Sequence, residues 1–333
     1  MPLALNGAQR CDVRTAIQVA LINNMPDSVL VDTESQFIDL LSAASGDIPL
    51  RISLFSLPGI SRCERAQNRI ASVYCGLDSL WNGRFDAVIV TGTEPRHADL
   101  RQEPYWSSLV DVLNWAQENT VSTILSCLAA HASVLHSEGI AREPLSRKQF
   151  GVFSFKRANN HRLMRGIGEV VEVPHSRWND VPARALTSCG YTLLTESADA
   201  GADLFVKQKR KSLFVHFQGH PEYRNDTLFK EYQRDVRRFL KGVGDTYPGE
   251  PEGYFDAAAG AALRAFRAHA MTHRSEQAMT EFPASAVAGG VLNTWRSTAQ
   301  DIYRNWLLYV ASRGSEDRVR SAVSARGLIG MKS

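Results

Sequence analysis

The sequence predicts an α/β fold built on a doubly wound, mostly parallel sheet. Short apolar runs alternate along the chain with amphipathic helical patterns, which is typical of βαβ units. The 333 residues are 44% hydrophobic and 22% charged, so the chain can bury a sizeable core. Reactive side chains also follow several predicted strands, where active sites of such sheets gather.

The predicted elements follow one another closely from about residue 15. We expect strands where apolar runs are short, and helices where apolar residues recur every three or four positions. The strands are predicted at 16–22, 50–57, 85–90, 121–125 and 213–217, and the helices at 33–44, 105–117, 128–135 and 225–240. Residues 141–212 are interpreted as shorter β-rich segments that extend or flank the sheet.

Composition predicts where the chain divides. Residues 15–242 are expected to form one catalytic α/β domain. Residues 241–254 are rich in Gly, Pro and acidic side chains, which indicates a linker. Helical patterns at 257–272 and 293–313 then predict that residues 243–313 are a linker and a helical C-terminal extension packing on the domain. Residues 314–333 are a tail for which we make no structural prediction.

Charge and cysteine usage exclude several classes of protein. The net charge of +3 gives no strong case for a nucleic-acid partner, and the basic run at 207–211 is interpreted as a solvated turn. No apolar run is long enough to cross a bilayer, and residues 1–14 lack the apolar core of a signal peptide. Five scattered cysteines without a C-x-x-C pair argue against a disulfide framework and a zinc ribbon. We therefore expect a cytoplasmic protein, with no membrane partner and no bound metal.

Cys127 is the first candidate for chemistry. It lies directly between a predicted strand and a predicted helix, the position of a nucleophile on a tight strand-to-helix turn. The dipole of the following helix would stabilise a thiolate there, and the Leu128 N–H would face a developing oxyanion. The turn lacks the flanking glycines of such elbows, and a buried structural cysteine is the alternative.

Two further loops follow strands. In Gly219-His220-Pro221-Glu222-Tyr223, His220 could serve as a base and Glu222 could orient it; the alternative is an ordinary helix N-terminal turn. The loop after residue 90 contains Gly92, and could bring a second backbone N–H to the reaction centre, or be a simple turn.

Arg177 is a candidate from a different part of the chain. It follows Pro174-His175-Ser176, and its guanidinium could bind a substrate carboxylate with two parallel hydrogen bonds. A structural role at the surface is the alternative.

Taken together, these motifs resemble those of homoserine O-succinyltransferases and O-acetyltransferases, which have a flavodoxin-like, class I glutamine-amidotransferase-like fold. The resemblance runs from about residue 15 to 310. It is carried, in order, by Asn24-Met25-Pro26, Thr33 to Phe37, Asp86 to Gly92, Tyr105-Trp106, Ser122-Thr123 with Cys127, Pro174 to Arg177, Gly219 to Tyr223, Glu231 with Arg234, Trp295 to Ser297 and Asn305 to Leu307.

The resemblance implies a ping-pong acyl transfer toward methionine biosynthesis, with succinyl-CoA or acetyl-CoA as co-substrate and no permanently bound cofactor. Cys127 would carry the acyl group as a thioester, with His220 as base and Glu222 as its partner. The oxyanion would be held by the N–H groups of Leu128 and of the Thr93 loop. The substrates are small molecules, and a homodimer is implied.

The resemblance also implies an acceptor site. Arg234 would hold the carboxylate of the acceptor homoserine, with Glu231 and Ser176 as its neighbours.

The chain departs from the family pattern in places that bear on specificity. Asp27-Ser28-Val29-Leu30 stands where the family usually has lysines, and Leu128-Ala129 follows the nucleophile instead of Trp-Ala. By spacing from Cys127, the position that separates succinyl from acetyl enzymes falls on Arg96. An arginine there could pair with a succinyl carboxylate, which favours succinyl.

Other functions stay open at this point. The acceptor could be serine or another hydroxy compound. The same Cys-His-Glu set could serve an amidase or glutaminase, with water as acceptor. A non-catalytic binding protein could also have kept the fold.

Overall fold

The computed structural model describes residues 16–329, and the side chains of residues 16–313. A seven-stranded sheet lies at its centre, and five adjacent strands of it run parallel. Antiparallel strands β10 and β7 extend one edge. In spatial order the strands are β2 (Leu50–Phe55), β1 (Ile17–Ile22), β3 (Ala87–Val90), β4 (Ser122–Ser126), β11 (Ser212–Phe217), β10 (Leu204–Lys209) and β7 (Thr192–Leu193). The predicted doubly wound, mostly parallel α/β fold is confirmed.

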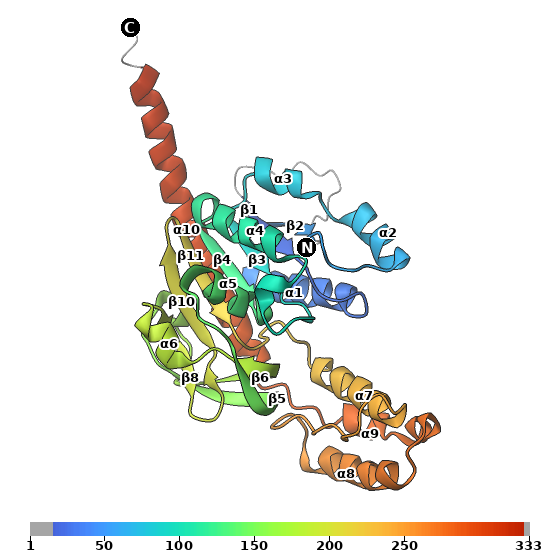
Figure 1. Cartoon of the computed structure of the whole chain (residues 1–333). Coiled ribbons are helices and arrows are strands. Elements are labelled where there is room, and N and C mark those ends of the chain that lie inside the picture. The colour runs from blue at the N-terminus through green and yellow to red at the C-terminus, as the bar shows by residue number, and fades with distance from the viewer. Residues whose placement is uncertain (1–15, 330–333) are drawn as a thin grey trace.

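Helices cover both faces of this sheet (Figure 1). On one face, α1 (Leu30–Ser45) and α10 (Arg296–Ile329) share a hydrophobic cluster with the strands. On the other face, α3 (Leu77–Asn82), α4 (Trp106–Asn119) and α5 (Leu128–Glu138) do the same. The central strands are buried on both sides, which explains their continuous apolar runs. A further helix, α2 (Glu64–Val73), follows β2.

A second, antiparallel sheet flanks the first. It contains β6 (Val170–Asp180), β5 (Glu143–Arg157), β8 (Thr195–Ser197) and β9 (Gly201–Ala202), with α6 (Ala183–Ser188) between β6 and β7. The segments predicted within 141–212 therefore do both things expected of them: β7 and β10 extend the main sheet, and the others flank it. The solvated turn predicted for the basic run at 207–211 is limited to Arg210 and Lys211, which are exposed between β10 and β11. Lys207 and Lys209 belong to β10 instead, and both pair with Glu138.

A lobe of helices lies beside the main body (Figure 1). It contains α7 (Thr227–Leu240), α8 (Ala257–Thr272), the 3-10 helix η3 (Glu276–Glu281) and α9 (Ala284–Ala288), which share one cluster of buried aromatic and aliphatic side chains. Phe150 and Val152 of β5 belong to the same cluster. The lobe is thus packed against the second sheet.

The C-terminal extension is tied to the core of the main body. The Trp306 indole N–H on α10 donates to Ser122 Oγ on β4 over 2.9 Å, with both side chains buried. The Trp295 indole N–H donates to the carbonyl of Tyr223 over 3.0 Å. Two tryptophans near the chain's end therefore brace the segments that carry the candidate site. The helix α10 continues through residue 329, into the region for which no prediction was made.

Among residues 16–329, no helix combines the length and the apolar character that a membrane-crossing helix needs.

Candidate active site

The candidate nucleophile lies where a strand turns into a helix. Cys127 follows β4 directly and precedes the first residue of α5. Its backbone is in the left-handed region, with φ of 51°, a conformation that costs a non-glycine residue about 1 kcal/mol or more. The strain is held in place by the Cys127 N–H, which donates to the Phe217 carbonyl over 2.8 Å. The thiol is free and only partly buried. This is the geometry of a nucleophile elbow.

His220 and Glu222 come from the end of the neighbouring strand. β11 pairs in parallel with β4, so the turn after Phe217 lies beside Cys127. His220 Nδ1 and Glu222 Oε1 are 2.9 Å apart, and both side chains are buried. The Ser126 hydroxyl donates to the same carboxylate oxygen over 3.3 Å. Because Nδ1 is taken by Glu222, Nε2 is the imidazole nitrogen left for the thiol.

Charge on the imidazole is favoured in this arrangement. Burial opposes the charged form, but the Cys127 thiolate and the Glu222 carboxylate outweigh it and raise the pKa of His220 well above its usual value. The other buried histidines behave in the opposite way. Burial lowers the pKa of His131 to about 3 and that of His175 to about 4. His220 is therefore set apart by its two anionic neighbours.

The buried carboxylate of Asp203 stabilises the turn that carries His220. Asp203 Oδ1 accepts the Gly219 N–H over 2.7 Å, and the Pro174 carbonyl accepts the His220 N–H over 2.8 Å. A Cβ on Gly219 would lie 2.6 Å from Val173 Cγ1 and 2.7 Å from His175 Nε2. Only glycine fits between the two sheets at this point, which places His220 at the sheet's edge.

The Thr93 loop lies against the start of α5. A Cβ on Gly92 would be 3.1 Å from the Leu128 backbone nitrogen. The Thr91 hydroxyl donates to the Gly92 carbonyl over 2.9 Å, which fixes the peptide that ends in the Thr93 N–H. Leu128 opens α5, so its N–H has no partner within the helix. The two predicted oxyanion donors, Leu128 and Thr93, thus belong to adjacent segments beside Cys127.

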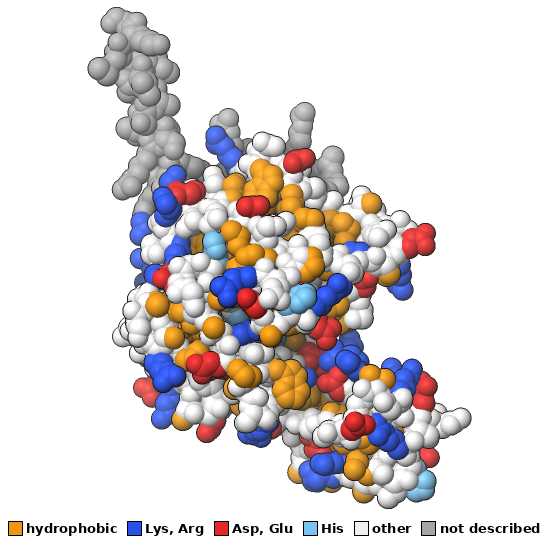
Figure 2. Space-filling model, in the orientation of Figure 1, with side chains coloured by type: hydrophobic (Ala, Val, Ile, Leu, Met, Phe, Trp, Pro, Cys, Tyr) orange, Lys and Arg blue, Asp and Glu red, His pale blue; other side chains and the backbone are white. Residues whose placement is uncertain are grey.

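Ser176 and Glu231 meet across the boundary between the second sheet and α7. The Ser176 hydroxyl donates to Glu231 Oε2 over 2.6 Å, and the Tyr223 hydroxyl donates to Glu231 Oε1 over 2.7 Å. Lys148 of β5 lies 3.9 Å from the same carboxylate. Figure 2 shows charged side chains of both signs along this boundary. The sequence analysis predicted no functional role for Tyr223 or Lys148, because no local motif distinguishes this tyrosine or this lysine from others in turns and strands.

Arg234 lies one turn after Glu231 on α7. Its guanidinium contacts Asp235 at 3.0 Å and is half-exposed. Burial opposes its charge, but Asp235, Glu231 and Glu94 outweigh that effect and raise the pKa of Arg234. Arg234 is thus near both the Thr93 loop and the Ser176–Glu231 pair.

Arg177 lies elsewhere, and the protein itself uses its hydrogen-bonding groups. Its Nη1 donates to Asp180 Oδ1 over 2.7 Å and its Nη2 to the Ala200 carbonyl over 2.6 Å, while Nε donates to His175 Nδ1. The side chain is 2% exposed. A guanidinium with these partners has little left to offer a substrate. The geometry supports a structural role, but a buried one and not the surface role given as the alternative.

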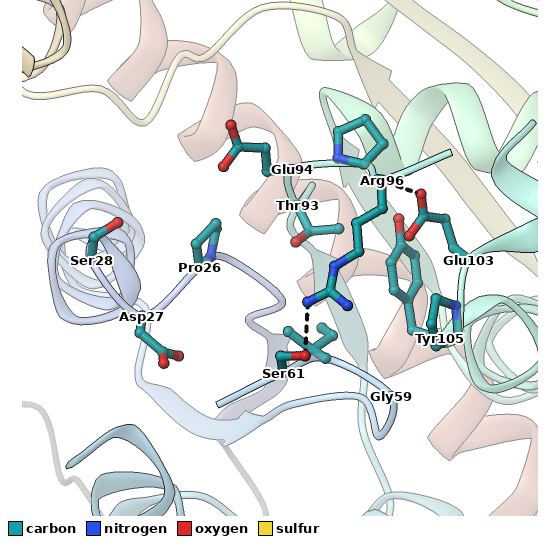
Figure 3. Close-up of a pocket in the computed structure, with 13 residues that line it drawn as sticks. Pro26, Asp27, Ser28, Gly59, Ser61, Thr93, Glu94, Arg96, Glu103 and Tyr105 are labelled. Atoms are coloured by element: carbon teal, nitrogen blue, oxygen red, sulfur yellow. Dashed lines mark hydrogen bonds between the residues drawn. The ribbon is translucent and has the colours of Figure 1, made fainter. Parts of the chain in front are cut away.

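Arg96 lines a pocket of about 520 Å³ next to the Thr93 loop (Figure 3). Its Nη2 donates to Ser61 Oγ over 2.7 Å, across the pocket. One wall contains Pro26, Asp27 and Ser28, the segment that departs from the family pattern. Arg62 braces that wall through Asp27 at 3.1 Å and the Met25 carbonyl at 2.5 Å. The pocket reaches the site through Thr93 and does not include Cys127 itself.

The described residues contain no cluster of three or more His, Cys, Asp or Glu side chains arranged to hold a metal ion.

A partly exposed thiol on an elbow, beside a buried histidine and glutamate from the next strand, is the arrangement that a cysteine nucleophile of an α/β enzyme would need. The chain belongs to the homoserine O-succinyltransferase family and is an acyltransferase: the model of that family matches residues 1–316. It is 45% identical over 296 residues to a homoserine O-succinyltransferase of Rhodopseudomonas palustris, covering 89% of each chain. It is also 40% identical over 306 residues to one of Bradyrhizobium japonicum, covering 92% of this chain and 93% of that one.

Among solved structures, the chain is similar to a glutamine amidotransferase of Thermotoga maritima. The identity is 12% and the TM-score 0.43, and the match covers 89% of this chain and 98% of that chain.

Proposed function

We propose that this protein transfers a succinyl group from succinyl-CoA to the hydroxyl of homoserine, through a thioester on Cys127. The observation that carries the proposal is the Cys127–His220–Glu222 set at adjacent strand ends. The names of the relatives, homoserine O-succinyltransferases, support both the donor and the acceptor. They also favour succinyl over acetyl, as the sequence did.

In the first half-reaction the Cys127 thiolate attacks the thioester carbonyl of the donor. A bond forms between Cys127 Sγ and the acyl carbon, and the bond from that carbon to the coenzyme A sulfur breaks. The His220 imidazolium gives its proton to the departing coenzyme A thiolate. The N–H groups of Leu128 and Thr93 stabilise the oxyanion between these events.

In the second half-reaction His220 acts as the base. It is now neutral and accepts the proton of the acceptor hydroxyl, whose oxygen attacks the thioester carbon. The new carbon–oxygen bond forms as the bond to Cys127 Sγ breaks, which restores the thiolate beside the imidazolium. Glu222 keeps Nε2 directed at the reacting atoms by holding Nδ1 over 2.9 Å.

The acceptor site lies between β6 and α7. Arg234 holds the acceptor carboxylate, for which its half-exposed guanidinium is available. Glu231 and Ser176 face the acceptor's ammonium and hydroxyl end, and Lys148 lies 3.9 Å from the Glu231 carboxylate. Arg177 is assigned to bracing β6 instead. Free thiols at Cys63, Cys127 and Cys189 fit a reducing compartment and thus a cytoplasmic enzyme.

An assay of coenzyme A release tests the proposal. Succinyl-CoA and acetyl-CoA are each supplied with homoserine, with serine or with no acceptor, and glutamine is tested separately for ammonia release. Fastest turnover with succinyl-CoA and homoserine is expected. Turnover with serine instead would change the acceptor, and glutamine hydrolysis without coenzyme A release would favour the amidase alternative. Light scattering on the same preparation decides whether the enzyme is the homodimer that we expect.

A further inference from the structure

Arg142 is a basic residue that the mechanism above does not use. It follows α5, the helix that starts at Cys127, and lies before the long strand β5. Its Nη2 donates to the carbonyl oxygens of His97 and Ala98, each over 3.2 Å. These bonds anchor the guanidinium to the loop that begins at Thr93. Arg142 therefore joins the end of the nucleophile's helix to the loop that carries an oxyanion donor.

Arg142 also has no carboxylate partner among the residues whose side chains the structure describes. Within the described part of the chain it makes no salt bridge shorter than 4.0 Å, and its Nη1 and Nε form no hydrogen bond there. The groups whose charges interact with it are Tyr105, Glu103 and Cys127. Glu103 is already committed, since its Oε1 accepts the N–H groups of Arg96 and His97 over 2.6 and 2.7 Å. A half-buried cation thus lies against the loop that follows Thr93, with N–H donors to spare.

A second donor lies beside it. Tyr105 is 6% exposed, and its hydroxyl is buried without a hydrogen-bond partner in the residues that the structure describes. A buried hydroxyl left without a partner costs roughly 1–3 kcal/mol, and an acceptor that arrived from outside would remove that cost. The ring lines the pocket next to the Thr93 loop (Figure 3).

We propose that Arg142, with the Tyr105 hydroxyl, binds the distal carboxylate of the succinyl group carried on Cys127. The inference rests on the proposed function. A succinyl thioester places that carboxylate roughly 5 Å from the sulfur, as single bonds of about 1.5 Å dictate. A guanidinium with free N–H groups matches a carboxylate in charge and shape. An acetyl group would reach neither residue.

Arg96, which the sequence singled out for this role, is the competing residue. It is exposed, and its guanidinium reaches away from the Thr93 loop to Ser61 on the far side of the pocket (Figure 3). Arg142 is half-buried, and among the described residues only its Nη2 is used, in hydrogen bonds to the His97 and Ala98 carbonyls. The two arginines flank the same loop, so each serves as the matched control for the other.

The test compares Arg142→Gln with Arg96→Gln, Arg142→Lys and Tyr105→Phe in single-turnover acylation of Cys127, followed by intact mass, with succinyl-CoA and with acetyl-CoA. Arg142→Gln is expected to slow acylation by succinyl-CoA ten- to hundredfold, the effect of losing about 1.5–3 kcal/mol of charge-assisted hydrogen bonding. Acylation by acetyl-CoA should stay within about twofold of wild type. Arg142→Lys should restore part of the succinyl rate, and Tyr105→Phe should lose several-fold with succinyl-CoA alone.

Three outcomes would overturn the inference. Equal slowing with both donors in Arg142→Gln would mean that Arg142 only holds the loop. A changed donor preference in Arg96→Gln, with none in Arg142→Gln, would return the role to Arg96. Wild-type protein that forms no thioester with succinyl-CoA would refute the proposed function itself, and with it the carboxylate that Arg142 is said to bind.

Discussion

The imidazole of His220 stacks on the ring of Tyr223, with centroids 4.2 Å apart and 14° between the planes. The hydroxyl of the same tyrosine donates to Glu231 over 2.7 Å. One side chain therefore supports the proposed base on its face and orients the proposed acceptor-binding carboxylate at its tip. Tyr223 therefore contacts both the proposed base and the proposed acceptor site, although it takes part in no bond-breaking step.

Tyr223→Phe separates these two contacts, because it keeps the stack and removes only the hydrogen bond to Glu231. Formation of the thioester should proceed at the wild-type rate. Transfer to the acceptor should fall about tenfold, as expected for losing a hydrogen bond to a charged group. Rapid-quench measurement of each half-reaction checks this. Slowing confined to thioester formation would show that Tyr223 serves His220 alone.

Glu222→Gln should lower transfer by roughly 10²- to 10⁴-fold and change its pH dependence. The carboxylate helps to raise the pKa of His220, so neutralising it lowers that pKa. The imidazolium that stabilises the thiolate is then lost at a lower pH than in wild type. Alkylation of Cys127 by iodoacetamide at pH 6 to 7 should slow by about tenfold for each pKa unit lost.

The matched control for this experiment is Glu118→Gln, which removes a carboxylate from the exposed side of α4. Its alkylation profile should overlay that of wild type. An unchanged profile in Glu222→Gln as well would contradict a charged His220–Glu222 pair.

Gly219→Ala should both destabilise the fold and impair catalysis. The added methyl group would meet Val173, His175 and Asp203 at 2.9 Å or less, and overpacking of this kind costs about 1–3 kcal/mol. Relief of the clash must move the turn that carries His220. Gly244→Ala is the control, because nothing lies within 4 Å of the added carbon there. Thermal unfolding and steady-state rates check both, and a wild-type rate in Gly219→Ala would refute the tight placement.

Arg234→Gln should raise the KM for the acceptor about ten- to hundredfold, since about 1.5–3 kcal/mol of charge-assisted bonding to its carboxylate is lost. The rate of thioester formation should not change. Arg237→Gln, one turn later on the exposed side of α7, removes the same charge from the helix without touching the site. If both variants raised the KM equally, Arg234 would act only by adding to the positive charge of α7, and not by contacting the acceptor carboxylate.

Much of the fold could be predicted because its central strands are buried on both faces. Their apolar runs are continuous, and the strand-end positions of Cys127 and His220 follow from the parallel order. Strands flanking the sheet were expected within residues 141–212, but their pairing into a separate antiparallel sheet could not be predicted, since half-exposed strands such as β5 alternate weakly and pair with distant partners. The helix α2 was missed because it buries only Ala66 fully and shows little apolar pattern.

The site was predicted only where a local motif marks it. The His220–Glu222 pair is two residues apart in the chain, so its spacing is visible in the sequence. Arg177 shows the limit of such reasoning: its partners Asp180 and Ala200 come from the fold, and they turn a candidate ligand into an internal brace. Arg142 shows the converse, because only folding brings it to the loop after Thr93.

The most direct test of the central claim is the intact mass of the protein after incubation with succinyl-CoA and no acceptor. The account predicts a gain of one succinyl group on wild type, none on Cys127→Ala, and loss of the adduct when homoserine is added. Turnover of homoserine by wild type without any adduct on Cys127 would contradict the thioester mechanism. Full activity of the Cys127→Ala variant would contradict it as well.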